Sequence, residues 1–225
     1  MIKYIGSKRV LVPHILRAVS AFPESERVLD LFSGTSRVGR ALKGTGRHVT
    51  ANDHLSYAAT LARCYVQADR ERWAEPAARL LDELSETAPV AGYFTKTFCE
   101  DARYLHPENG AKVDAVREEI ASRELHPELE AIALTSLMEA ADRVDSTTGV
   151  QMAFLKKWAA RASNPLGLRV PDMAPGPGRA LQMEAAAAAA EVQADVAYLD
   201  PPYNQHSYMG NYHVWESLVR WDKPE

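Results

Sequence analysis

The sequence predicts an α/β fold built on a parallel sheet, and two patterns support this expectation. The apolar segments 28–32 and 196–199 each read as a buried strand that carries or meets an aspartate at a sharp loop. Around the first segment, helical and strand patterns alternate along the chain. Such alternation is typical of parallel strands joined by crossover helices.

The first third of the chain supplies two of these helix and strand pairs. Apolar periodicity over Ser7–Phe22 predicts a helix, with Pro13 near its first turn or kinking it. A strand follows over Arg27–Phe32, and a second helix opens at Thr35-Ser36. After a glycine turn, Arg47–Asn52 reads as the second strand.

A largely helical insertion follows the second strand. No strand pattern as clean as the first two appears before Arg161, and a loop rich in proline and glycine over Asn164–Arg179 returns the chain to the sheet. The helices expected in the insertion are Leu55–Ala68, Arg72–Glu86, Val113–Glu124, Pro127–Asp142 and Met152–Arg161.

The sheet resumes after this loop. A strand is expected over 179–183, a crossover helix over Ala185–Ala190, and a further strand over 195–199. Alanine is the strongest helix former, although a disordered low-complexity segment is an alternative for this run. A last helix is expected over Tyr212–Trp221. We therefore expect a discontinuous core, 1–54 and 176–225, and a helical insertion over 55–175.

Composition places the chain among ordinary globular proteins. Hydrophobic residues make up 46% and charged residues 25% of its 225 residues. No apolar stretch reaches the roughly 18 residues of a membrane span, and the N-terminus lacks a signal-peptide pattern, so a cytoplasmic location is expected. Cys64 and Cys99 lack the spacing of a metal site or a disulfide framework, so we expect plain thiols and no bound metal.

Charge is distributed unevenly, although the net charge is only −4. Residues 1–23 carry four lysines and arginines and no acid, and residues 146–180 carry five against Asp172 alone. Such local patches could meet a phosphate backbone without a basic protein overall. The alternative is a set of solvated surface cations.

The loop after the first strand, Ser33-Gly34-Thr35-Ser36, has the composition of a ligand-binding turn. Gly34 allows a ligand to approach the backbone, and the following helix N-terminus favours an anion. Ser36 replaces the second glycine of a dinucleotide motif, which disfavours pyrophosphate. Asp53 follows Gly34 by 19 residues, where an acid can bind ribose hydroxyls. A structural turn and a helix cap are the respective alternatives.

The Asp200-Pro201-Pro202-Tyr203 loop suits a planar exocyclic amine. The Asp200 carboxylate and the Pro201 carbonyl can accept its two hydrogens, the prolines fix the carbonyl direction, and Tyr203 offers a flat face for stacking. The same tetrapeptide also occurs as an ordinary turn. Its meaning therefore depends on the strand before it and on the Asp30 loop.

Three separated motifs together resemble a known family. Lys3-Tyr4-Ile5-Gly6-Ser7-Lys8 is similar to K-[YW]-x-G-[GS]-K, residues 30–34 to D-x-F-x-G, and residues 200–203 to D-P-P-Y. In this order they resemble the Dam-like, or alpha-class, adenine-specific DNA methyltransferases. Segments 98–103 and 145–156 resemble the helical middle part of that class. The likeness spans essentially the whole chain.

The resemblance implies methyl transfer from S-adenosyl-L-methionine to the N6 amine of an adenine flipped out of double-stranded DNA. It implies catalytic roles for Asp200, Pro201, Pro202 and Tyr203. Glu184 is included among the cofactor residues, although its neighbour Met183 stands where glycine is common. The implied cofactor-binding residues are Tyr4, Lys8, Asp30, Phe32, Ser33, Gly34, Ser36, Asp53, Glu184 and Asp200.

Target recognition is expected, by resemblance, around Thr147-Thr148-Gly149 and the following segment. Lys156, Lys157 and Arg161 are the candidate DNA contacts there, with a solvated helix face as the alternative for the two lysines. Phe154 and Trp158 are expected in the core. A cognate restriction endonuclease is a further partner that the resemblance suggests.

The resemblance also refines the expected fold to a Rossmann-like S-adenosylmethionine-dependent methyltransferase sheet. Such a sheet uses about three more strands than the four predicted here, so we expect the C-terminal strands to be missing from this chain. Alternatives are an inactive, truncated module that binds cofactor or DNA, and methylation of another planar amine. A nicotinamide dehydrogenase is disfavoured, because that class predicts a third glycine in the first loop and gives no reason for an Asp-Pro-Pro-Tyr motif.

Overall fold

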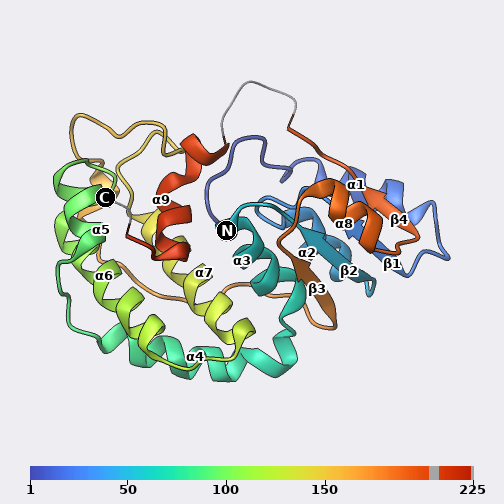
Figure 1. Cartoon of the computed structure of the whole chain (residues 1–225), viewed down its shortest axis with the longest axis horizontal. Coiled ribbons are helices and arrows are strands. Elements are labelled where there is room, and N and C mark those ends of the chain that lie inside the picture. Colours follow the sequence, from blue (N-terminus) through green and yellow to red (C-terminus); the bar gives the residue numbers. More distant parts are fainter. Residues whose placement is uncertain (203–207, 224–225) are drawn as a thin grey trace. The chain divides into compact units, whose positions relative to one another are not determined.

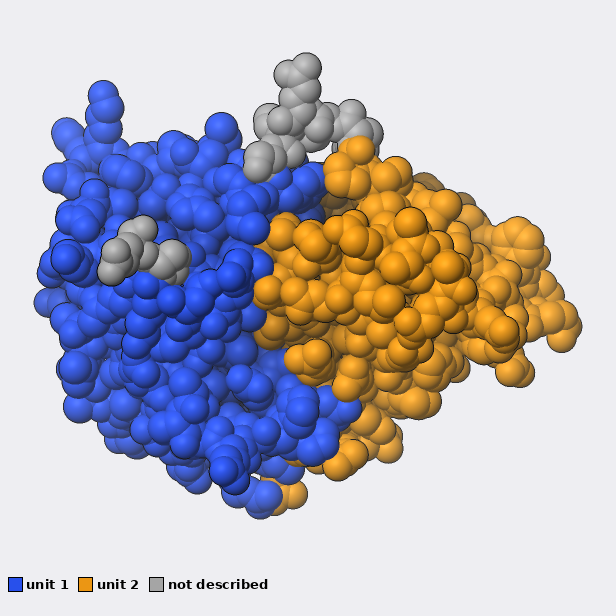
Figure 2. Space-filling model, viewed as in Figure 1, with its two compact units in different colours: residues 1–5, 76–170, 205–225 blue, residues 6–75, 171–204 orange. Residues whose placement is uncertain are grey.

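A computed structural model describes residues 1–202 and 208–223. The chain forms two compact units (Figure 2). Unit 1 comprises Met1–Ile5, Pro76–Val170 and Gln205–Glu225, and unit 2 comprises Gly6–Glu75 and Pro171–Asn204. Each unit is described separately below.

Unit 2 contains a four-stranded parallel sheet with the order β3-β2-β1-β4 (Figure 1). Its strands are β1 (Arg27–Asp30), β2 (His48–Asn52), β3 (Gly178–Leu181) and β4 (Val196–Tyr198). In the register of the sheet, Val28 pairs with Val49 on one side and with Val196 on the other. The predicted parallel α/β sheet is confirmed, with strand ends that differ by one or two residues from those expected.

Helices cover both faces of this sheet. Ala188 of α8 (Ala185–Glu191) packs against Leu29 and Leu31, so the alanine run is the predicted crossover helix. Successive residues of a strand point to opposite faces, so Asp30 faces away from Leu29. On that second face α2 (Arg37–Lys43) approaches β1 closely, since a Cβ added at Gly39 would lie 2.9 Å from the Asp30 carboxylate. Unit 2 also contains α1 (Val12–Ser20).

The edge strand β3 is packed against a π-helical turn. Helix α3 (Ser56–Ala62) continues into this turn, η1 (Arg63–Gln67). A Cβ added at Gly178 would lie 2.2 Å from the carbonyl oxygen of Val66, so only glycine fits there. The side-chain oxygen of Gln67 accepts a hydrogen bond from the Ala180 amide at 3.1 Å.

Unit 1 is helical in its described part, as the sequence predicted for the middle of the chain. Asp114 of α6 (Pro107–Ser122) holds the segment 92–95, because its carboxylate accepts hydrogen bonds from the amides of Gly92, Phe94 and Thr95. Helix α4 begins in unit 2 and continues into unit 1. The bounds of these elements are α4 (Arg70–Glu86), α5 (Tyr93–Thr95), η2 (Lys96–Glu100), α6 (Pro107–Ser122), α7 (Pro127–Arg143), η3 (Ala160–Ser163) and α9 (Tyr208–Arg220).

The helix predicted over Met152–Arg161 is wrong. Thr147 and Phe154 form an antiparallel bridge, and residues 152–159 are not helical. Ser146 holds this segment, because its carbonyl accepts from the Leu155 amide at 2.8 Å and its hydroxyl accepts from the Ala159 amide at 3.1 Å. These contacts replace the hydrogen bonds of a helix.

The expected burial of Phe154 and Trp158 is also wrong, because their exposed fractions are 40% and 38%. Cys64 and Cys99 are buried and are not joined in a disulfide. Among the described residues, no helix is long and apolar enough to cross a membrane.

Candidate active site

Four acidic residues stand at the carboxyl ends of the four parallel strands of unit 2. Asp30 ends β1, Asp53 directly follows β2, and Glu184 and Asp200 follow β3 and β4. Carboxyl ends of parallel strands lie at one edge of a sheet, and ligands of open α/β sheets bind at that edge. The strand order reverses direction between β1 and β4, which places the switch point between Asp30 and Asp200.

Asp30 is buried at this edge of the sheet, with an exposed fraction of 1%. Its Oδ2 accepts hydrogen bonds from the Gly39 amide at 2.9 Å and from the Ser33 hydroxyl at 3.2 Å. Its Oδ1 is buried and has no hydrogen-bond partner within the described part of the chain. Burial raises the pKa of Asp30 to about 7, against the opposing effect of these hydrogen bonds. Nearby Asp53 and Asp200 raise the same pKa further.

The loop after β1 is held by the protein's own groups. Gly34 has a φ of +52°, and its amide donates to Asp53 Oδ2 at 2.8 Å. Ser36 also has a positive φ, +58°, a region that glycine adopts more easily, and its hydroxyl lies 3.0 Å from that of Ser33.

Asp53 connects the end of β2 to this loop. Besides the Gly34 amide, its carboxylate accepts from the Leu55 amide at 3.1 Å. Burial raises the pKa of Asp53, and these backbone hydrogen bonds oppose that rise. A carboxylate offers about four acceptor positions, so both contacts leave acceptor capacity for a ligand. The ribose contact of Asp53 stays a prediction.

Asn52 is a residue of this edge that the sequence reasoning missed. Its side-chain amide donates to the carbonyls of Leu31 and Met183, at 3.3 and 3.2 Å, and its oxygen accepts from the Met183 amide at 3.1 Å. The side chain therefore joins the loops that follow β1 and β3. The available signal was an amide residue at the end of a predicted strand, directly before Asp53.

Asp200 has a different environment from Asp30. Its carboxylate forms an ion pair with Lys8 at 2.6 Å, and the exposed fractions of the two side chains are 28% and 17% for Asp200 and Lys8. The structure thus brings together two motifs from opposite ends of the sequence. Pro201 and Pro202 follow as exposed residues, and Tyr203 lies outside the described residues.

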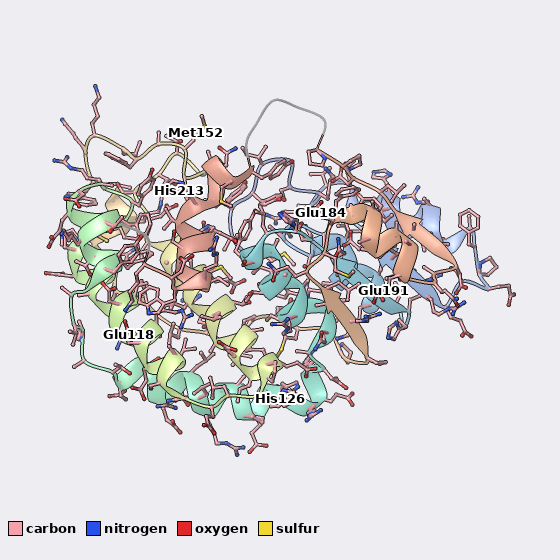
Figure 3. The ribbon with its side chains drawn as sticks, in the orientation of Figure 1. Glu118, His126, Met152, Glu184, Glu191 and His213 are labelled. Carbon is pink, nitrogen blue, oxygen red and sulfur yellow. The ribbon has the colours of Figure 1, made fainter. Side chains whose placement is uncertain are left out.

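The other predicted cofactor residues occupy varied positions. Phe32 packs against the apolar cluster of Leu29, Leu31 and Ala188. Glu184 is exposed at the start of α8, with a carboxylate oxygen 3.4 Å from His54 Nδ1 (Figure 3). Tyr4 belongs to unit 1, where its ring stacks on that of Tyr212 at 4.7 Å.

The candidate DNA contacts lie in unit 1. Lys156 and Lys157 are exposed. Arg161 is held by the protein, because its guanidinium donates to Asp145 Oδ1 at 2.7 and 2.9 Å and to the Thr147 carbonyl at 2.7 Å. This arginine therefore supports the Thr147 segment, and its contact with DNA stays a prediction.

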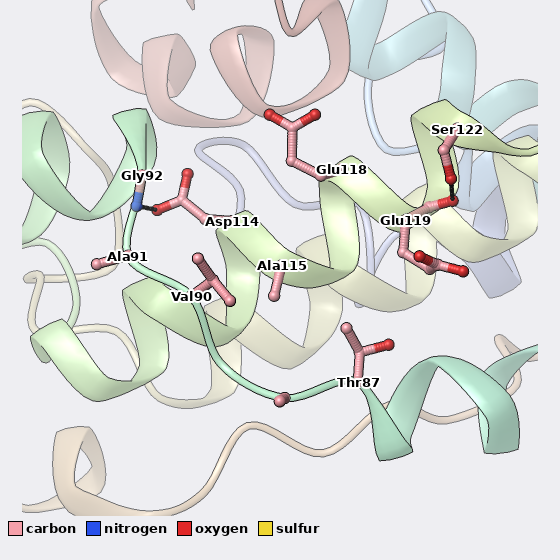
Figure 4. Close-up of a pocket in the computed structure, with 10 residues that line it drawn as sticks. Thr87, Val90, Ala91, Gly92, Asp114, Ala115, Glu118, Glu119 and Ser122 are labelled. Carbon is pink, nitrogen blue, oxygen red and sulfur yellow. Dashed lines mark hydrogen bonds between the residues drawn. The ribbon is translucent and has the colours of Figure 1, made fainter.

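A separate cavity of about 500 Å³ lies in unit 1 (Figure 4). Its walls include Asp114, Glu118 and Glu119 of α6 together with the segment 87–92. Its lining includes none of the residues predicted for cofactor or DNA. The acidic strand ends of unit 2, rather than this cavity, therefore carry the candidate site.

Comparison with known proteins finds methyltransferases and modification methylases that are similar to this chain over almost its whole length. The chain is 33% identical to the type II methyltransferase M.NlaIII of Neisseria lactamica over 233 residues, which cover 97% of this chain and 69% of that protein. It is 31% identical to the modification methylase StsI of Streptococcus sanguinis, over 99% of this chain and 37% of that protein. The modification methylase LlaI of Lactococcus lactis is 28% identical over 99% of this chain, which spans 39% of its length.

No solved structure matches the chain. The family match is extensive, since it covers residues 4–225, which include the four strand ends described above. The chain belongs to the D12 class N6 adenine-specific DNA methyltransferase family.

Proposed function

We propose that this protein transfers a methyl group from S-adenosyl-L-methionine to the N6 amine of an adenine extruded from double-stranded DNA at a specific site. The observation that carries the proposal is the Lys8–Asp200 ion pair at the switch point of the sheet. It joins two family motifs beside the loop held by Asp30 and Asp53. Family membership supports the same reaction.

The charges at the strand ends suit the proposed cofactor. Asp30, Asp53, Glu184 and Asp200 surround one edge of the sheet, and Lys8 is paired with one of them. S-adenosylmethionine carries a positive sulfonium, and an acidic edge complements a cationic ligand. When bound, it supplies an electrophilic methyl group. Asp53 is the candidate for its ribose, and the Gly34 loop for its amino-acid end.

Asp200 is the proposed acceptor for the target amine. The N6 lone pair of adenine is delocalised into the ring, so the free amine is a poor nucleophile. A carboxylate and the Pro201 carbonyl that accept its two hydrogens favour a lone pair directed at the methyl group. Lys8 contacts the Asp200 carboxylate through an ion pair at 2.6 Å. Prearranged acceptors of this kind stabilise the charge that develops on the amine.

Duplex DNA is the proposed substrate, and unit 1 offers cations for it. The exposed pair Lys156 and Lys157 follows an exposed loop that contains Met152, and such cations can neutralise phosphates. Reaction at N6 requires that the adenine leave the stack, with Tyr203 as the proposed stacking partner. A cytoplasmic location and a cognate restriction endonuclease complete the proposal.

Cofactor binding and methyl transfer can be tested separately. Calorimetry with S-adenosylmethionine measures the first, and transfer of labelled methyl to a mixed-sequence duplex, followed by nucleoside mass spectrometry, identifies the second. We expect N6-methyladenine as the product. N4-methylcytosine would indicate another planar amine as the target. Binding without any transfer would support a non-catalytic module instead.

The DNA surface has its own test. Because each phosphate contact contributes about 0.9 to the slope of log K against log salt, Lys156→Ala with Lys157→Ala should lower the slope by up to about 1.8. Fluorescence anisotropy over a salt series measures it. Arg70→Ala with Arg72→Ala, two exposed cations of α4, removes the same charge and should leave the slope unchanged. An unaltered slope in the lysine variant would indicate that both lysines are solvated surface residues that do not contact phosphates.

A further inference from the structure

Helix α9 of unit 1 is interrupted at Tyr212, whose φ and ψ of −137° and 20° are not helical. An interruption leaves amides of the next turn, and carbonyls of the preceding turn, without partners inside the helix. The side chains of Asn211, Val214 and Trp215 around the break are buried. Buried backbone groups that lose their helical partners at such a break need partners from another segment.

Gln151 supplies partners on both sides of this break. Its side-chain oxygen accepts hydrogen bonds from the amides of Val214 and Trp215, at 3.0 and 3.4 Å. The backbone amide of Gln151 donates to the Asn211 carbonyl at 2.9 Å. Gln151 is 3% exposed, and its Nε2 is buried with no partner among the described residues. The acceptor oxygen is therefore the part of the side-chain amide that the structure uses.

The segment that carries Gln151 is a short loop closed by the bridge between Thr147 and Phe154. The Thr147 hydroxyl donates to Asp145 at 2.7 Å and accepts from the Gly149 amide at 3.1 Å, which fixes the base of the loop. Met152, next to Gln151, has an exposed fraction of 63%. In Figure 3, Met152 and His213 mark the loop and α9.

Two residues of the N-terminal motif, Tyr4 and Ile5, contact Tyr212 at the break. The Tyr212 hydroxyl accepts a hydrogen bond from the Ile5 amide at 2.6 Å, and the Tyr212 ring stacks on Tyr4. Lys3 forms an ion pair with Asp145 at 3.0 Å, so the same N-terminal segment also contacts the base of the loop. Within unit 1, the loop, the N-terminal motif and α9 form one hydrogen-bonded group. Helix α9 starts eight positions after Asp200 in the chain.

We infer that Gln151 is a positioning residue that fastens the loop 147–154 to the break in α9, and that methyl transfer to DNA depends on this contact. The inference rests on the proposed function. Its physical basis is that the Gln151 side-chain oxygen accepts hydrogen bonds from two amides of α9 close to the break at Tyr212. Loss of the Gln151 oxygen would remove this partner from the Val214 and Trp215 amides, in the helix that starts eight positions after Asp200 in the chain.

Three variants of the full chain separate this role from simple stability. Gln151→Met keeps the length and removes the acceptor, and Gln151→Glu keeps an acceptor oxygen while removing the unpartnered Nε2. Ser136→Ala is the matched control, because the Ser136 hydroxyl bonds both the amide and the carbonyl of Arg169 and touches neither the loop nor α9. Single-turnover transfer, DNA affinity and melting temperature are measured for each.

For Gln151→Met we expect single-turnover transfer to fall by at least about 10-fold, since small displacements of reacting groups can cost up to about 100-fold. DNA affinity should stay within about threefold, because phosphate contacts dominate it. Gln151→Glu should retain the parent rate, and Ser136→Ala should retain it at a comparable loss of melting temperature. A parent rate in Gln151→Met, or an equal loss in Ser136→Ala, would overturn the inference.

Hydrogen exchange at the Val214 and Trp215 amides provides a readout that does not depend on activity. We expect faster exchange at these two amides in Gln151→Met and parent-like exchange in Gln151→Glu. Unchanged exchange in Gln151→Met would refute the capping contact itself. The parent protein could also transfer no methyl to DNA while the exchange pattern is as expected. That result would refute the proposed function and the dependence of transfer on Gln151. The contact of Gln151 with the Val214 and Trp215 amides would still be established.

Discussion

Asp30 and Asp200 stand at the carboxyl ends of neighbouring strands, and the structure gives them opposite environments. Asp30 is buried, its contacts are the Gly39 amide and the Ser33 hydroxyl, and its pKa is raised to about 7 by burial. Asp200 is partly exposed and paired with Lys8. The comparison teaches that two aspartates at the same edge of a sheet can differ in their roles: Asp30 holds the groups of the protein around it, whereas the Asp200 carboxylate is partly open to solvent.

The comparison predicts first that Asp30 makes stability depend on pH. Below about pH 4 its carboxyl is protonated in both states; between about pH 4 and 7 the unfolded chain releases the proton first, so the native state loses stability as pH rises. The loss is on the order of 4 kcal/mol at most, for a pKa raised to about 7.

Asp30→Asn cannot titrate, so we expect its free energy of unfolding, relative to the parent, to rise between pH 4.5 and about 7. Urea unfolding over this range measures the difference. Asp142, whose pKa burial raises to about 6, titrates in both proteins and cancels. A difference that stays constant with pH would show that Asp30 is ionised throughout.

The second prediction concerns Asp200 and the reaction. Asp200→Ala should lower single-turnover methyl transfer by at least about 100-fold, as expected for loss of a prearranged hydrogen-bonding group. Asp195→Ala is a suitable control, because Asp195 precedes β4 at the opposite edge of the sheet and pairs with Arg27. The control should transfer at the parent rate. Equal rates in the Asp200 variant and the parent would remove Asp200 from catalysis.

Asp53 lies between these two cases, since it holds the Gly34 amide and is also the predicted ribose ligand. Asp53→Ala should weaken S-adenosylmethionine binding by about 1.5–3 kcal/mol, the scale of a hydrogen bond to a charged group. Calorimetry measures the affinity, with exposed Glu184→Ala as a comparison. If the affinity of Asp53→Ala equalled that of the parent, Asp53 would belong with Asp30 as a residue that holds groups of the protein.

The smallest expected effect is at Ser36. A left-handed conformation costs a residue with a Cβ about 1 kcal/mol relative to glycine. Ser36→Ala loses the contact with the Ser33 hydroxyl and keeps this cost, whereas Ser36→Gly loses the contact and is relieved of it. We therefore expect Ser36→Gly to be more stable than Ser36→Ala by about 1 kcal/mol in thermal unfolding. Equal stabilities would indicate that the loop readjusts.

The sheet and most helices could be predicted because their signals are local. The apolar run at Val28–Leu29 and the alanine run of α8 need no distant contact to be recognised. The segment 152–159 was mistaken for a helix because its conformation depends on Ser146 and on the Gln151 contact with α9. Those contacts join residues that are distant in the sequence or belong to different elements.

The same distinction applies to the candidate site. Gly34, Asp53 and Asp200 were predicted from strand ends and motif spacing, and Lys8 only from the resemblance. The bridging role of Asn52 depends on which strand lies beside β2, which no local pattern reveals. The burial of Asp30 likewise depends on a contact that no local pattern reveals, the close approach of Gly39 to its carboxylate.

The contact between Gln67 and β3 also bears on aggregation. In the described sheet β3 is an edge strand, and unpaired edge amides invite a strand from another molecule. Gln67 occupies the Ala180 amide, and the backbone of η1 lies against Gly178. A second chain therefore finds neither a free donor at Ala180 nor room to approach Gly178. This π-helical turn therefore disfavours association of another strand with the β3 edge of the described sheet.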